Sequence, residues 1–128
     1  MATSGLEQIL SSKPASADLS ADQYKFVNFD ATPELQLAGA GEVGYILQDK
    51  PTAQGNNGTI LLAGKGKVII GEAISAGEFL TPDAAGLAVL AAPATGVNEE
   101  VCCEALEDGA NSGDLISVFV NRFTLQGA

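Results

Sequence analysis

The side chains that most often carry out chemistry in proteins are few in this chain of 128 residues. There is no His, so a Ser or Cys nucleophile would lack its usual base. Cys102 and Cys103 are adjacent, so in a strand they point to opposite faces, and a disulfide between neighbours is strained. Without His, this pair does not favour a zinc site either. We interpret the cysteines as two small apolar residues in a reducing compartment, with an intermolecular disulfide as the alternative.

Carboxylates are the second set of groups with chemical potential. They concentrate towards the C-terminus, at Glu99, Glu100, Glu104, Glu107, Asp108 and Asp114. The run from Glu107 to Asp114 lacks the alternating ligands and the central Gly of a calcium loop, which favours a solvated acidic rim. A carboxylate pair of the glycosidase kind is disfavoured because aromatic residues, which would hold a sugar, are only 5% of the chain. We therefore expect no enzyme, no metal and no cofactor.

Three short motifs imitate functional sites. Gly64-Lys65-Gly66 resembles a phosphate loop, but Thr59 and Gly66 stand where that motif requires Gly and Ser or Thr. Asn57-Gly58-Thr59 is formally a glycosylation sequon, and Asn-Gly is also typical of a tight hairpin turn. Lys50, which resembles the modified lysine of a lipoyl domain, is followed directly by Pro51. We interpret all three as turns between strands.

The net charge of the chain narrows the classes of molecule that it could bind. Six basic and sixteen acidic residues give −10, which disfavours nucleic acid and anionic membrane surfaces. No apolar run reaches the 18 residues of a membrane span, and Met1 to Leu10 has neither the basic nor the apolar region of a secretory signal. The partners that remain are proteins, small molecules or a metal cation held by carboxylates. We expect a soluble protein that is made and used, or assembled, inside a cell.

Fifteen Gly and five Pro, spread along the chain, predict many short elements joined by turns. The expected fold is all-β, a compact antiparallel β-barrel or sandwich (β-tulip or β-clip-like) of about eight or nine short strands with an extended N-terminal arm. The expected strands are 24–29, 35–37, 43–47, 59–63, 67–70, 79–81, 87–89, 101–106 and 115–123. Residues 43–49 echo residues 102–108, which suggests two similar hairpins about a pseudo-twofold axis.

The first 22 residues differ from the rest. Ser11 to Ala21 is polar, small and broken by Pro, whereas the period-two pattern begins at Tyr24. We expect an arm over residues 1–22, flexible or ordered on a partner, and a β domain over residues 23–128.

Four phrases, in order along residues 17–120, resemble a known family. They are residues 17–27 (ADLSADQYKFV), 43–51 (VGYILQDKP), 67–83 (KVIIGEAISAGEFLTPD) and 106–118 (LEDGANSGDLISV). Together they are similar to the small capsid decoration, or cement, proteins of tailed bacteriophages. Cys103 departs from the family, which usually has Gly before its A-L-E phrase.

The resemblance implies a protein that binds the outer surface of the assembled capsid and stabilises contacts between major capsid subunits, often as a homotrimer. Its partners would be the major capsid protein and itself, and its location the virion. The arm residues that would contact the capsid are Leu6, Ile9, Leu10, Lys13, Leu19 and Tyr24. Two alternatives remain: another virion component such as a tail or head-fibre protein, and a β-clip binding module of the SAF type, whose characteristic phrase resembles residues 74–83.

Overall fold

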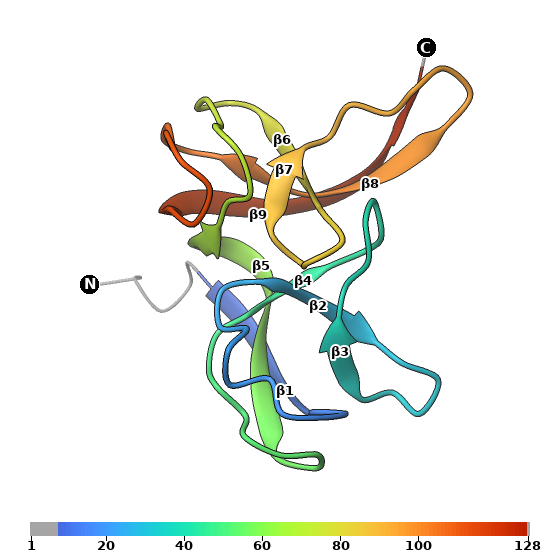
Figure 1. The fold of residues 1–128 in the computed structure, drawn as a ribbon, viewed down its shortest axis with the longest axis vertical. Helices are drawn as coiled ribbons and strands as arrows, with labels where there is room; N and C mark the ends of the chain where they lie inside the picture. Colours follow the sequence, from blue (N-terminus) through green and yellow to red (C-terminus); the bar gives the residue numbers. More distant parts are fainter. Residues whose placement is uncertain (1–7, 128) are drawn as a thin grey trace.

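The computed structural model describes residues 8–127, and every regular element in them is a β-strand (Figure 1). It contains no helix that is long and apolar enough to cross a membrane within this part of the chain. The strands are β1 (Gln8–Pro14), β2 (Phe26–Phe29), β3 (Leu35–Leu37), β4 (Tyr45–Leu47), β5 (Asn57–Ile69), β6 (Phe79–Pro82), β7 (Ala88–Leu90), β8 (Asn98–Ala105) and β9 (Leu115–Gln126). The predicted all-β fold is confirmed.

The long strand β5 joins two lobes (Figure 1). The strands follow the order β3-β2-β4-β5-β9-β8-β6-β7, and all the ladders between them are antiparallel. Residues 57–64 of β5 pair with β1, whereas residues 64–69 pair with β9. We call β1 to β4 with the first half of β5 the N unit, and the second half of β5 with β6 to β9 the C unit.

The two units have the same topology. In the N unit, β2 pairs with β3 and β4, and β4 pairs with β5; in the C unit, β6 pairs with β7 and β8, and β8 pairs with β9. A single parallel bridge closes each curled sheet, Ala15 to Leu35 in one and Ile70 to Ala88 in the other. The chain therefore folds as two copies of one five-stranded unit that share β5.

Backbone hydrogen bonds match between the units residue by residue. The N–H of Tyr24 donates to the Leu47 carbonyl (2.6 Å), and the N–H of Gly77 donates to that of Ala105 (2.8 Å). Tyr24 and Gly77 also share a left-handed backbone, with φ of 67° and 90°. Because Tyr carries a Cβ, this conformation is strained in the N unit and nearly free of strain in the C unit.

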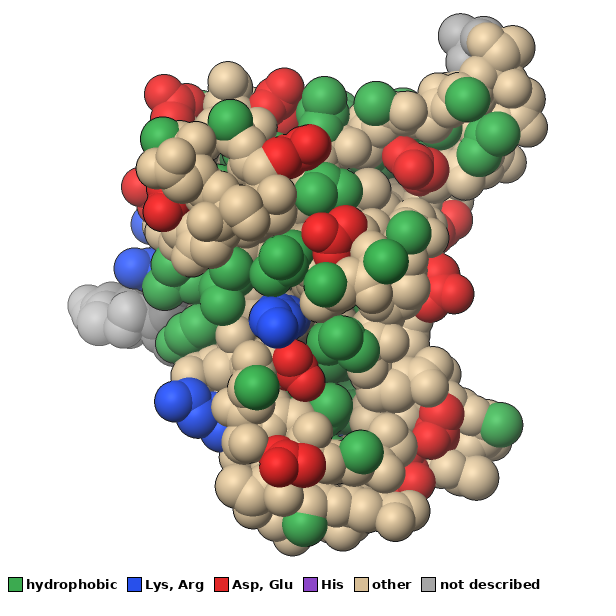
Figure 2. Space-filling model, viewed as in Figure 1, with side chains coloured by type: hydrophobic (Ala, Val, Ile, Leu, Met, Phe, Trp, Pro, Cys, Tyr) green, Lys and Arg blue, Asp and Glu red, His purple; other side chains and the backbone are tan. Residues whose placement is uncertain are grey.

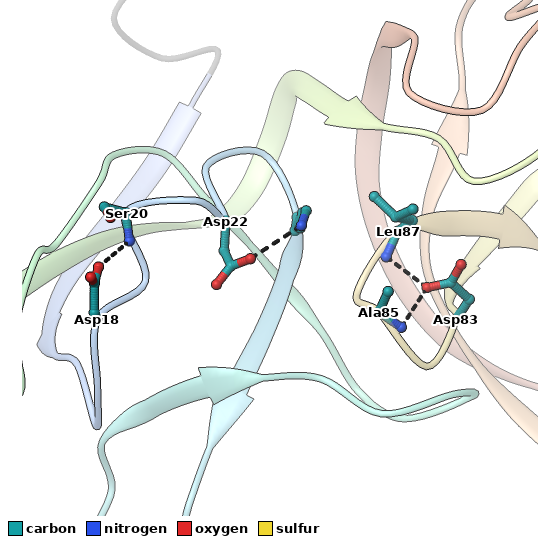
Figure 3. A network of polar contacts seen from close by, with 7 residues as sticks. Asp18, Ser20, Asp22, Asp83, Ala85 and Leu87 are labelled. Carbon is teal, nitrogen blue, oxygen red and sulfur yellow. Dashed lines mark hydrogen bonds and ion pairs between the residues drawn. The ribbon is translucent and has the colours of Figure 1, made fainter.

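The turn after the second strand of each unit is built on one aspartate. Asp83 accepts hydrogen bonds from the backbone N–H groups of Ala85 (2.8 Å) and Leu87 (2.9 Å), as Figure 3 shows. In the N unit, Asp30 accepts from the N–H groups two and four residues further on, at 2.9 and 3.0 Å. An Asp side chain that bonds the backbone ahead of it is a common turn former. Figure 3 also shows Asp18 accepting from the N–H of Ser20.

The interiors of the units correspond as well. Six buried residues fill the N unit: Ala15, Leu19, Val27, Leu35, Leu47 and Ile60. Their counterparts in the C unit, in the same order, are Ile70, Ile74, Leu80, Ala88, Ala105 and Val118, all in the larger second cluster. Leu47 and Ala105 occupy equivalent positions, so the predicted echo is real but its register was one residue out.

Three further predictions need correction. Gly64-Lys65-Gly66 is not a turn, because β5 runs through it and merges two predicted strands. The turn before β5 lies earlier than predicted: its positive φ of 88° falls on Gly55, whereas Asn57 and Gly58 are already in the strand. Residues 8–22 are not a separate arm in this structure, since β1 pairs with β5 and Ala15 is buried.

Candidate interaction surface

The predicted capsid-contacting residues divide into two groups. Ile9, Leu10 and Lys13 are exposed on β1, which pairs with β5 along one edge. Leu19 and Tyr24 were expected in the same surface, but Leu19 is buried in the N unit core and Tyr24 packs against the larger core. Leu19 is therefore covered by the rest of the N unit, whereas Tyr24 is partly buried. Leu6 lies outside the described residues.

The cysteines are interior residues. Cys102 and Cys103 are both free and buried. Burial raises the pKa of the Cys102 thiol to about 11, and it raises that of Cys103 well above its ordinary value. A thiol that stays protonated is a poor nucleophile and a poor metal ligand. The prediction that they serve as small apolar residues matches their place in the core.

The C-terminal carboxylates hold turns. Glu107 accepts from the N–H of Ser117 (2.7 Å), and Asp108 accepts from the N–H of Ala76 (2.8 Å). The hydrogen bond from Ser117, with a smaller contribution from the charges of Lys67 and Lys65, holds the pKa of Glu107 below its usual value. Over residues 8–127, no group of three or more His, Cys, Asp or Glu side chains gathers in a way that could hold a metal ion. Glu107 and Asp108 of the predicted acidic rim thus accept hydrogen bonds from backbone N–H groups.

The units differ most in one row of side chains on the outer face of the sheet. In the N unit, Phe26, Ile46 and Leu61 lie side by side on β2, β4 and β5, and all three are fully buried. We call these residues the covered row. They belong to the same hydrophobic cluster as the interior of the C unit. The C unit therefore covers this face of the N unit.

The equivalent row of the C unit is exposed. Phe79, Glu104 and Phe119 lie side by side on β6, β8 and β9, and we call them the open row. Phe119 is 46% exposed and Phe79 38%, although the Phe79 ring also meets Phe123 edge to face at 5.0 Å. The alternation of exposed Leu115 and Phe119 with buried Ile116 and Val118 is visible in the sequence and was a signal for this surface.

The open row has a mixed-charge border. Lys65 pairs with Phe119 across β5 and β9, and Lys67 pairs with Ser117 in the next row. Exposed apolar side chains Leu106 and Leu115 lie on the same face of the sheet. In the view of Figure 2, acidic side chains spread over the molecule, whereas the few basic ones lie near its middle height. Two of the six basic residues thus border this single face.

Arg122 joins the two units. It lies at a β-bulge in β9, where the register with β8 shifts, and its guanidinium reaches into the N unit. Its nitrogens donate to the carbonyls of Leu62 (2.5 Å), Leu61 (3.2 Å) and Gly44 (3.5 Å), and it stacks 4.2 Å from the centre of the Tyr45 ring. Leu62 is itself at a bulge of β5 against β1. Burial lowers the pKa of Arg122, and its guanidinium donates to three backbone carbonyls of the N unit.

Comparisons with known proteins give one informative result. No protein-family model and no curated protein matches the sequence. Among solved structures, the fold is similar to the N base of the head fibre protein gp8.5 of bacteriophage phi29. The match has a TM-score of 0.66 and 18% sequence identity, and it covers 93% of this chain and 98% of that one. The two proteins therefore share a fold over almost their whole lengths.

Proposed function

We propose that this protein is a structural component of a phage virion, which attaches to the outer surface of the head as the base of a fibre does. The observation that carries this proposal is the likeness to the phi29 head fibre base across nearly all of both chains. The net charge of −10 and the buried cysteines are compatible with a binding role without catalysis. The partners in this proposal are the major capsid protein and further copies of the chain, in a homotrimer.

A narrower role as a cement protein is the second candidate, favoured by the four sequence phrases in residues 17–118. The two roles differ in their effect on the shell. A cement protein holds adjacent capsid subunits together, and so raises the temperature at which heads release DNA. A fibre base needs only to stay attached.

Head binding is tested by mixing the purified protein with heads of its phage that lack it, and measuring co-sedimentation. We expect saturable binding, and mass spectrometry should find the protein in purified virions. Its absence from virions, together with failure to co-sediment, would overturn the proposal. A rise in the release temperature of loaded heads would select the cement role, and an unchanged temperature the fibre base.

The β1 surface is the part of the predicted arm that remains available for the capsid. We expect Ile9→Ser with Leu10→Ser to weaken co-sedimentation at least tenfold, because both side chains are exposed and apolar. Val97→Ser, at a position that is 48% exposed on the opposite lobe, is the matched control. Equal binding by both variants would remove β1 from the interface.

A further inference from the structure

The internal repeat shows what kind of surface covers the outer face of a unit. In the N unit, the covered row meets the C unit directly: the Leu61 side chain lies so close over Gly66 that a Cβ there would come within 2.4 Å of it. The N–H of Phe26 donates to the carbonyl of Gly86 in the β6–β7 turn (2.7 Å). This face of one unit is thus complementary to another unit of the same fold.

The C unit presents the same face with no third unit to cover it. In the N unit, the cross-strand neighbours of the covered row run from Phe26 through Ile46 and Leu61 to Leu10. In the C unit, the equivalent neighbours of the open row run from Phe79 through Glu104 and Phe119 to Lys65. Large apolar groups at both aromatic positions are half exposed, and an apolar surface with a charged border is typical of an interaction site.

Charge favours a second copy as the occupant. Two acidic chains repel each other over most of their surfaces, since each carries −10. Around the open row, Lys65 and Lys67 balance Glu104 and Glu107, so this face is close to neutral. A second copy that binds to this face buries its apolar area without bringing an excess of like charge together.

We propose that the open row, with its bordering residues Leu106, Leu115, Lys65 and Lys67, is the surface through which this chain binds a second copy of itself. The inference rests on the self-association proposed above, and it identifies the face that performs it. The second copy contributes a surface other than its own open row. The contact between the N unit and the C unit is asymmetric in the same way, because its two sides are different surfaces. Such head-to-tail contacts close into rings when the rotation permits.

Sedimentation velocity of the purified full chain, over a hundredfold range of concentration and without capsids, tests the proposal. We expect the wild type to associate, and Phe119→Asp to raise the dissociation constant at least tenfold, because it places a carboxylate in the apolar centre. Val97→Asp is the matched control, since it adds the same charge at an equally exposed apolar position. We expect it to associate like the wild type.

A second variant guards against loss of folding. Lys65→Glu with Lys67→Glu changes only exposed side chains of β5, and leaves the face strongly negative. We expect at least tenfold weaker association, partly restored by 0.5 M salt because salt screens the repulsion. Lys50→Glu with Ala53→Glu and Gln54→Glu is its control, because it makes the same change in net charge at exposed positions of the loop before β5.

The outcomes separate the two proposals. A wild type that stays monomeric at every concentration overturns self-association itself. A wild type that associates, with Phe119→Asp and the Lys65/Lys67 variant unaffected, overturns only the open row. If each variant self-associates like the wild type but no longer co-sediments with heads, the open row binds the capsid and not a second copy.

Discussion

The N unit and the C unit have one topology, one turn construction and one set of six interior positions, yet they use their outer faces in opposite ways. Phe26 and Phe79 are the same residue at the same place in the repeat. Phe26 is fully buried because the C unit lies over it, whereas Phe79 is 38% exposed. The fold of a unit therefore does not decide whether its outer face is core or surface. That depends on what lies next to it.

The largest expected effect comes from truncating these two phenylalanines. Phe26→Ala should lower the free energy of unfolding by about 3–5 kcal/mol, since it leaves a cavity between the units. Phe79→Ala should cost about 1–2 kcal/mol, mostly through the lost contact with Phe123. Urea unfolding at two protein concentrations measures both and separates folding from self-association. Equal losses for the two variants would mean that the units are not covered differently.

The junction between the units supplies the next largest effect. Arg122→Met keeps the apolar stem but removes the donors to the Gly44, Leu61 and Leu62 carbonyls. We expect a loss of about 2–3 kcal/mol, because three backbone carbonyls of the N unit lose a charged donor. Lys67→Met, on an exposed position of β5, should change stability by less than about 0.5 kcal/mol. If the two substitutions cost the same, Arg122 does not hold the units together.

Much of this comparison was accessible from the sequence, and the part that was missed has physical causes. The strands with period-two alternation, such as residues 26–29 and 115–123, were predicted within a few residues. β1 was missed because its side chains are mostly polar and exposed, and its stability comes from backbone pairing with β5, which leaves no pattern in residue type.

The long β5 was divided because two glycines in three residues usually mark a turn. In this strand, Gly66 instead leaves room for the side chain of Leu61, which belongs to the covered row. Packing against residues far away in the sequence explains Leu19 and Tyr24, which local sequence patterns assign to an arm. Such burial depends on contacts between residues far apart in sequence, and no local pattern reports it.

A smaller effect concerns how the stability of the protein changes at acid pH. The hydrogen bond from the N–H of Glu34, and more weakly those of Thr32, hold the pKa of Asp30 below its usual value. A lowered folded-state pKa adds stability above the unfolded pKa, about 4, and this is lost as the pH falls through the folded value. Asp30→Asn should therefore reduce the loss of stability between pH 5 and pH 2. Thermal unfolding across that range measures it, and an unchanged slope would show that the turn of the N unit does not depend on this charge.

The last prediction concerns the reactivity of the two cysteines, which tests how well the interior of the C unit is protected. Because the pKa of Cys102 is about 11, only about 0.1% of its thiol is ionised at pH 8, and Cys103 is buried more completely. We expect neither to react with a thiol reagent such as dithionitrobenzoate in the native protein, and both to react in 6 M guanidinium chloride. In the Phe26→Ala variant, which opens the contact over the core that both cysteines share with Phe26, native-state reaction should become faster. Rapid reaction of the unmodified protein would show instead that the two units separate readily, and that the covered row is covered only part of the time.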